Sequence, residues 1–459
     1  MDVVLLSRIQ FALTIGFHYF YPPLSIGLAL MIVCMEGAYL KTKKKLYKEM
    51  AKFWTKIFAL TFAMGVATGL VQVFAFGNNW SRYSEFVGDV FGSVLAVEGV
   101  FAFFLEAGFI GLMLFGWDRV KPKTHFLATC CVAFGAHFSA IWIVAANSWM
   151  QTPAGFTIVG SGTDAHAVIT NFWTVLFNPS FLDRIAHVIL GCWLTGSFML
   201  VSVSAFYLLK KRHPQYSKPM LKLGLLASCI LLVLQLVSAD STARGVAVNQ
   251  PAKLAAMEGI YKTTPRTPLT AVGYVDTKEE RVVGIEVPAL LSFLVHRNFE
   301  TPVTGLDAFP RDEWPNVQIV FQSYHAMIAA WGLMMMLTSL GLFFFWRKSL
   351  DRSKWTLRGL TLSILLPYLA NQTGWVTAEA GRQPWVVYGI LRTVDGVSPS
   401  INANQVVGSI IMFICMYLLL FALFIFLLDR KIRTGPRDIE ESDLIYRDPF
   451  AGHEGGSHA

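Results

Sequence analysis

Long apolar stretches alternate with short polar connections along the whole chain. Nine stretches contain about 20 residues or more, the length a helix needs to cross roughly 30 Å of hydrocarbon. They occupy residues 12–38, 54–76, 93–116, 125–147, 184–208, 219–238, 320–346, 357–379 and 405–428. The pattern predicts an all-α integral membrane protein in which about nine transmembrane helices pack into bundles.

Lysine and arginine are concentrated in every second connection. They follow the first, third, fifth, seventh and ninth stretches, at residues 41–52, 119–123, 210–212, 347–358 and 430–437. The intervening connections contain fewer basic residues. Because basic loops stay on the cytoplasmic side, we expect the N-terminus outside and the C-terminus in the cytoplasm.

The composition agrees with a membrane protein. The 459 residues are 54% hydrophobic and 15% charged, with a mean hydropathy of +0.50, whereas a soluble protein contains about 25% charged residues. The net charge of +8 would suggest nucleic acid in a soluble protein, but here the basic loops explain it, so no nucleic-acid partner is expected. The six cysteines lie in apolar stretches without CxxC spacing, which argues against disulfides, zinc and covalently attached haem.

The polar segments divide the chain into four parts. Residues 1–238 contain six predicted helices, and residues 320–435 contain three more. Residues 239–319 form a long outer-side connection, and connections of this length are usually functional or disordered. Residues 436–459 are predicted to be a flexible cytoplasmic tail.

Ionisable or metal-ligating side chains occur at few places inside the apolar stretches. The predicted topology brings four of them, from four different helices, to the outer half of the membrane. These four are His18, His187, Met327 and Glu379, and the third stretch adds Glu98 and Glu106. An ionisable group in hydrocarbon is costly and therefore a functional candidate. Two histidines, a methionine and carboxylates together indicate haem iron and proton transfer.

Each candidate also has a structural interpretation. A single histidine in an apolar helix is more often a hydrogen-bonded structural residue than a ligand, and periodicity alone does not separate Met327 from Met334. Glu98 and Glu106 lie about 12 Å apart along a helix. They could be proton carriers, or buried acids bonded to Asn147 or Ser139.

The segment around Glu379 leaves two further interpretations open. Arg382 could form a simple ion pair with Glu379, or it could hold a haem propionate. Trp375 could belong to an interfacial aromatic belt. The alternative function is a haem-free, ion-coupled secondary transporter, which would require broken helices or inverted repeats around a midplane site.

Seven ordered motifs resemble subunit I of the cytochrome bd family of quinol oxidases, and the resemblance covers nearly the whole chain. The motifs are SRIQFALTIGFHYFYPPLSIG at 7–27, GVATGLVQVFAFGNNWSRYSEFVGDVFGSVLAVEG at 65–99, FAFFLEAGFIGLMLFGWDR at 101–119, SAIWIVAANSWMQTPAG at 139–155, KLAAMEG at 253–259, SYHAM at 323–327 and GWVTAEAGRQPW at 374–385. The 239–319 connection resembles the short form of the quinol-binding loop (Q-loop) of this family.

The resemblance implies the haem ligands. His187 and Met327 match the axial pair of a low-spin haem b. His18 and Glu379 match the ligands of a high-spin haem b and of a haem d or third haem b, and which residue holds which haem stays open. Arg8, Trp375 and Arg382 match surroundings of the haems.

The resemblance also implies proton-transfer and quinol-binding residues. Glu98 and Glu106 match carboxylates of proton transfer, and Lys253 and Glu258 match residues of quinol oxidation. One departure is His325, which stands where some members have arginine. We expect it to alter the charge around the low-spin haem.

The implied protein is a terminal respiratory oxidase subunit of the bacterial cytoplasmic (inner) membrane. It would oxidise quinol at the outer face and reduce O2 to water with protons from the cytoplasm, generating a proton-motive force without pumping. The resemblance implies a heterodimer with a homologous subunit II, in some members with a small single-span subunit. It leaves ubiquinol and menaquinol both open as donors.

Overall fold

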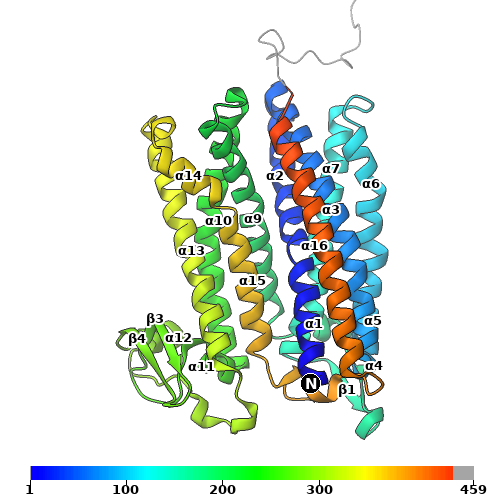
Figure 1. The fold of residues 1–459 in the computed structure, drawn as a ribbon, viewed down its shortest axis with the longest axis vertical. Coiled ribbons are helices and arrows are strands. Elements are labelled where there is room, and N and C mark those ends of the chain that lie inside the picture. The colour runs from blue at the N-terminus through cyan, green and yellow to red at the C-terminus, as the bar shows by residue number, and fades with distance from the viewer. Residues whose placement is uncertain (1, 438–459) are drawn as a thin grey trace, which may run out of the picture.

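The computed structural model describes residues 2–437, and most of them are helical. Figure 1 shows long helices running side by side along one axis, with the small elements gathered at one end. The helices of the bundle are α1 (Val3–His18), α2 (Tyr21–Thr42), α3 (Lys45–Asn79), α5 (Gly88–Val97), η1 (Glu98–Ala102), α6 (Phe103–Phe115), α7 (Pro122–Gln151), α9 (Phe181–Leu209), α10 (Pro214–Asn249), α13 (Val317–Trp346), α14 (Lys354–Leu362), α15 (Leu365–Ala380) and α16 (Ala403–Thr434). The predicted all-α membrane fold is confirmed.

Eight helical stretches among the described residues are long and apolar enough to cross a membrane. The first of them combines α1 and α2, and the predicted stretch at 357–379 is divided between α14 and α15. Prolines favour both interruptions. Pro22 and Pro23 lie in the first turn of α2, and Pro367 lies in the first turn of α15. A proline has no N–H to donate to the carbonyl group of the preceding helical turn. A helix therefore begins at a proline more readily than it continues through one.

Helix α9 lies at the centre of the packing, against α10 on one side and α2 on the other. Its contact with α2 depends on two glycines. A Cβ atom on Gly27 or on Gly196 would lie between 2.2 and 2.8 Å from backbone atoms of the opposite helix. Small residues let membrane helices approach closely and gain van der Waals contact. A side chain larger than hydrogen at either position would force α2 and α9 apart.

The smaller elements cluster at the end of the bundle where the N-terminus lies (Figure 1). They comprise three antiparallel strand pairs, short helices and 3-10 turns. The pairs are β1 (Phe156–Val159) with β2 (His166–Ile169), β3 (Leu269–Asp276) with β4 (Arg281–Val287), and β5 (Trp385–Val387) with β6 (Leu391–Arg392). The short helices and turns at this end are α4 (Ser81–Phe86), α8 (Phe172–Leu176), α11 (Pro251–Glu258), α12 (Leu290–His296), η2 (Gly162–Asp164), η3 (Leu306–Ala308), η4 (Arg311–Glu313) and η6 (Thr393–Gly396). The 3-10 turn η5 (Leu350–Arg352) instead follows α13 at the opposite end.

The long connection at 239–319 has defined secondary structure. Helix α10 continues to Asn249, beyond the predicted end at residue 238, and α11, the β3–β4 hairpin and α12 follow it. Hydropathy reveals only the part of a helix that lies in hydrocarbon, so the polar extension of α10 was not predictable from it. The hairpin packs on α13, which ties this segment to the membrane helices.

The five basic connections lie at the end of the bundle opposite the N-terminus (Figure 1). The fold therefore has the alternation that the charge pattern requires. Which end faces the cytoplasm stays a prediction. The predicted flexible tail at 436–459 lies, from residue 438 onward, outside the described residues.

Candidate functional site

The ligand-type residues are placed by four helices, all toward the end of the bundle that carries the N-terminus. His18 is the last residue of α1, His187 lies in the second turn of α9, Met327 lies in α13, and Glu379 lies near the end of α15. Helix α15 packs against both α13 and α9. Three of the four ligand helices therefore pack together, whereas α1 with His18 is not among them, and haem ligation by the four side chains stays a prediction. Within residues 2–437, no group of three or more His, Cys, Asp or Glu side chains is arranged to hold a metal ion.

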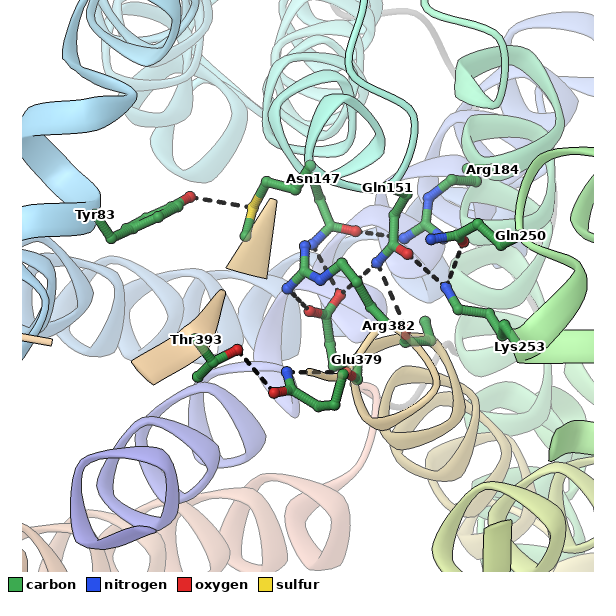
Figure 2. A network of polar contacts seen from close by, with 12 residues as sticks. Tyr83, Asn147, Gln151, Arg184, Gln250, Lys253, Glu379, Arg382 and Thr393 are labelled. Carbon is green, nitrogen blue, oxygen red and sulfur yellow. Dashed lines mark hydrogen bonds and ion pairs between the residues drawn. The ribbon is translucent and has the colours of Figure 1, made fainter. Parts of the chain in front are cut away.

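Glu379 is the centre of a buried polar network that joins α7, α9, α11 and α15 (Figure 2). Arg382 donates to its Oε2, and the amide groups of Asn147 and Gln151 donate to its Oε1 at 3.0 and 3.3 Å. Arg184 in turn donates to the side-chain oxygen of Asn147. Asn147 was one of the two partners considered for Glu98 and Glu106 as buried acids, but the long helix α7 presents it to Glu379 of α15 instead.

Lys253 belongs to the same network. Its ammonium donates to Gln151 Oε1 at 2.5 Å and to Gln250 Oε1 at 2.6 Å, and the residue is 2% exposed (Figure 2). Burial, and then the charge of Arg184, lower the pKa of Lys253 well below its ordinary value. Gln151 thus links a predicted quinol residue to a predicted iron ligand. The sequence did not single out Gln151, Gln250 or Arg184. Arg184 could have been identified from the sequence as a functional candidate, because it is a charged residue at the very start of the apolar stretch 184–208.

The network contains more positive than negative charge. Among residues 2–437, the guanidinium groups of Arg184 and Arg382 lie in this network with the carboxylate of Glu379, and Nε of Arg184 together with Nε and Nη1 of Arg382 are buried without hydrogen-bond partners. Unpaired buried donors of this kind are costly. The site therefore fits additional anionic groups, and the carboxylates of haem propionates have the required charge and geometry.

His18 has the protonation pattern of a metal ligand. The hydroxyl of Thr68 donates to the carbonyl of Met64 at 2.8 Å, so its oxygen can only accept from His18 Nδ1–H, which lies 2.9 Å away. Nε2 then keeps its lone pair. Metal-binding histidines usually donate their other N–H in this way. Gly69 faces the ring, since a Cβ there would lie 3.3 Å from His18 Cε1.

His187 contacts helix α10, and Met327 contacts helix α15. The side-chain nitrogen of Gln235 lies 3.1 Å from both ring nitrogens of His187. Gly374 faces Met327, because a Cβ at that position would lie 2.8 Å from the sulfur atom. Glycine at 374 leaves the thioether room to adjust, as a ligand must when it meets a large planar group.

His325 is held away from any metal-binding role. Its Nδ1 lies 2.9 Å from the carbonyl of Phe321, and its Nε2 lies 2.8 Å from the carbonyl of Thr270. Both nitrogens face backbone acceptors, so neither is free for iron. His325 ties α13 to strand β3 instead.

Glu98 and Glu106 flank an irregular part of their helix. Glu98 is the first residue of the π-helical segment η1, and Ser139 of α7 donates to its Oε1 at 2.7 Å. Glu106 follows in α6 and is 9% exposed. The predicted bond to Ser139 is confirmed for Glu98. Single π-helical turns insert an extra residue and occur often at functional sites.

Glu258 is buried on another side of α11 from Lys253. It is 3% exposed, it is hydrogen-bonded to Tyr324 of α13, and its Oε2 has no hydrogen-bond partner. Burial raises the pKa of Glu258 to about 7. The two predicted quinol residues therefore face different neighbours. Tyr324 was missed because aromatic residues are common in membrane helices.

The weaker predicted residues differ in position. Arg382 is buried in the Glu379 network, whereas Trp375 is partly buried on α15 and Arg8 is exposed near the start of α1. The structure thus brings Arg382, but not Arg8, into the candidate site.

Comparisons with known proteins agree along almost the whole chain. A family model described as cytochrome bd terminal oxidase subunit I matches residues 6–436. The chain is 41% identical to cytochrome bd ubiquinol oxidase subunit 1 of Bacillus subtilis, over 98% of each protein. It is 33% identical to cytochrome bd-II ubiquinol oxidase subunit 1 of Escherichia coli, over 95% of this chain and 97% of that protein. The structure of bd oxidase from Geobacillus thermodenitrificans superimposes with a TM-score of 0.89 and 30% identity, over 95% of this chain and 99% of that chain.

Proposed function

The chain belongs to the cytochrome bd terminal oxidase subunit I family, and we propose that it oxidises quinol and reduces O2 to water. Members of this family are haem-containing, multi-pass subunits of bacterial membrane oxidases that work with a second subunit. Within the chain, one observation supports the proposal most directly. Buried guanidinium donors of Arg184 and Arg382 beside Glu379 have no hydrogen-bond partner among residues 2–437, and the carboxylates of haem propionates would pair with them.

Four side chains would hold the haem groups. His187 and Met327 would hold a low-spin haem b, and His18 and Glu379 would hold a high-spin haem b and a haem d or third haem b. When bound, these groups supply electron transfer and an iron that binds O2. The protein supplies the orientation. Thr68 fixes the protonation of His18, and Arg382 and Arg184 provide donors for carboxylates.

Two sets of carboxyl groups would transfer protons, one at the quinol loop and one within the membrane helices. Glu258, at the end with the quinol-loop elements, would accept protons released from quinol. Glu106 and Glu98 would carry protons from the cytoplasmic side toward the site of O2 reduction, because buried carboxylates mark proton routes in membranes. Release outside and uptake inside would generate a proton-motive force without pumping.

The working oxidase would be a heterodimer with a homologous subunit II, and a small single-span subunit is part of the same proposal. Quinol and O2 are its substrates. Membership of this family favours the oxidase over the alternative, a haem-free ion-coupled transporter.

A spectrum of the purified two-subunit complex tests the function. We expect low-spin haem b bands in the reduced-minus-oxidised spectrum, a CO-sensitive band from a second haem, and O2 consumption that depends on added quinol. A CO-sensitive chlorin band in the red would identify haem d, and its absence would favour a third haem b. Well-folded complex with no haem and no quinol-dependent O2 consumption would overturn the oxidase and restore the transporter.

A further inference from the structure

The first turns of α13 are hydrogen-bonded to the quinol-loop segment at three positions. Gln322 donates to the carbonyl of Gly273 at 3.1 Å, His325 lies 2.8 Å from the carbonyl of Thr270, and Tyr324 is hydrogen-bonded to Glu258. The first two contacts hold strand β3. The third contact holds the side chain of Glu258, the predicted proton acceptor.

The backbone beside Glu258 is also fixed. Gly259 ends α11 with a positive φ of 70°, and a Cβ there would lie 2.2 Å from Val282 of the hairpin. Only glycine combines that conformation with that close approach. Met257, Phe321 and Val282 belong to the apolar cluster on which Tyr324 packs. Tyr324 brings a hydroxyl group to this cluster, and that hydroxyl group is hydrogen-bonded to Glu258.

Helical spacing places Glu258 near a candidate iron ligand. Tyr324 and Met327 are three residues apart on α13, and side chains at this spacing are neighbours on a helix surface. Tyr324, which is hydrogen-bonded to Glu258, therefore lies on the same face of α13 as Met327. Quinol oxidation requires a proton acceptor and an electron acceptor beside the same hydroxyl group, and this arrangement brings the two together.

We propose that Tyr324 is a positioning residue for quinol oxidation, whose hydroxyl group orients Glu258 so that the unpartnered Oε2 takes the proton of a quinol hydroxyl. The quinol O–H bond would break and an O–H bond would form at Oε2, and the electron released with the proton would pass to the haem group that His187 and Met327 would hold. This inference rests on the function proposed above. A pKa of Glu258 near 7 suits a group that must accept a proton at neutral pH.

The test compares Tyr324→Phe with the native complex, in the full two-subunit oxidase. We expect kcat/KM for quinol to fall about tenfold. We also expect the pH midpoint of quinol oxidation to move upward, because the tyrosine hydrogen bond lowers the pKa of Glu258. Haem content and the dithionite-reduced spectrum should not change. A purely structural role would alter stability and haem content without moving the midpoint.

Tyr261→Phe is the matched control, because Tyr261 belongs to the same apolar cluster and the substitution removes an equivalent hydroxyl group. It should leave the rate and the midpoint unchanged. Glu258→Gln distinguishes the role of Glu258 from that of Tyr324. Native quinol oxidation in Glu258→Gln would overturn the role of Glu258 and with it that of Tyr324. Impaired Glu258→Gln beside a native rate and midpoint in Tyr324→Phe would overturn the role of Tyr324 alone.

Discussion

At the scale of single residues, hydrogen-bond partners separate His18 from the structural histidines. Both nitrogens of His137 are used, one on the carbonyl of Ala133 and one on the indole N–H of Trp193, each at 2.7 Å. Both nitrogens of His125 are used as well, on Glu36 at 2.7 Å and on a carbonyl at 3.1 Å. Among the described residues 2–437, a hydrogen-bond partner is found for Nδ1 of His18 and none for its Nε2. The unpartnered Nε2 is what makes His18 a ligand candidate.

The first prediction concerns Thr68, which fixes the protonation of His18. Thr68→Val removes the acceptor for His18 Nδ1–H while keeping the shape of the side chain. Loss of such a supporting hydrogen bond typically costs about 10- to 100-fold in metal affinity or activity. We expect a lower haem content and a weaker CO-difference signal in the purified complex. Thr68→Ser should behave as native. Full haem content in Thr68→Val would show that the contact does not support the ligand.

The second prediction concerns the buried pair of Glu36 and His125, which are 2% and 3% exposed. Because both ring nitrogens face acceptors, the pair binds two protons and is neutral overall. Removing one partner of a buried pair costs about 3–5 kcal/mol. We expect Glu36→Ala and His125→Leu each to lower the unfolding midpoint strongly, and the double variant to lower it by less than the sum.

An exposed pair provides the control for this cycle. Lys218 and Asp351 lie 2.7 Å apart but their side chains are 57% and 53% exposed. Lys218→Ala should change the midpoint little, because exposed ion pairs contribute about 1 kcal/mol or less. Additive effects of Glu36→Ala and His125→Leu would contradict coupling between the buried partners.

The third prediction is a pH dependence set by Glu258. Its pKa is raised to about 7 by burial, so the carboxyl group is protonated below pH 7 and cannot accept a proton there. We expect kcat/KM for quinol to rise with pH through about 7 and then level off. In Glu258→Gln the rate should be low and this rise should disappear. A flat profile for the native complex would argue that Glu258 does not accept the quinol proton.

At the scale of helices, irregularities coincide with candidate residues. Helix α1 ends at His18, and Glu98 begins the π-helical segment η1. A regular helix through residues 88–115 would present Glu98 and Glu106 in a different relative direction, because one residue turns a helix by about 100°. The extra residue of η1 therefore sets which neighbours the two carboxylates face, and Glu98 reaches Ser139.

The fourth prediction is that deletion of Gly99 disrupts proton transfer by removing the extra residue. The deletion would rotate Glu98 away from Ser139 while keeping both carboxylates in the chain. We expect O2 consumption to fall about tenfold or more, as in Glu98→Gln, with low-spin haem b retained in the spectrum. A native rate in the deletion variant would show that the direction of Glu98 is unimportant.

At the scale of the whole molecule, the bundle has two chemically distinct ends. One end carries the N-terminus, the β3–β4 hairpin and the candidate site, and the other carries the basic connections (Figure 1). If the basic end faces the cytoplasm, the proposed function would release quinol protons outside and would draw the protons for O2 reduction across most of the bundle. The orientation would therefore decide whether the proposed reaction separates charge.

The fifth prediction tests that orientation by labelling single cysteines. Thr277 lies at the exposed turn of the β3–β4 hairpin, and Lys123 lies at the exposed start of α7. In intact cells, a membrane-impermeant maleimide should label Thr277→Cys and not Lys123→Cys, and disruption of the membrane should make both reactive. Background should be low because the native cysteines lie in membrane helices. The reverse pattern would invert the topology and the direction of proton release.

The apolar pattern alone determined the helical membrane fold, the approximate positions of the helices and the candidate functional residues inside them. Each of these depends on a local property, the transfer of a continuous apolar segment into hydrocarbon, so a single sequence is enough to reveal it. Identities such as His18, Glu98 and Glu379 were visible for the same reason, because polar groups in such segments are rare.

Only the tertiary structure decided which side chains meet. Asn147 bonds Glu379 across 232 residues of sequence, and Lys253 bonds Gln151 across 102. It also separated Lys253 from Glu258, which the resemblance had grouped together, and it gave Glu258 its partner Tyr324. Such contacts depend on the relative rotation and depth of several packed helices, and hydropathy contains no information about either. The chain therefore specifies its candidate residues locally, whereas their partners follow from helix packing.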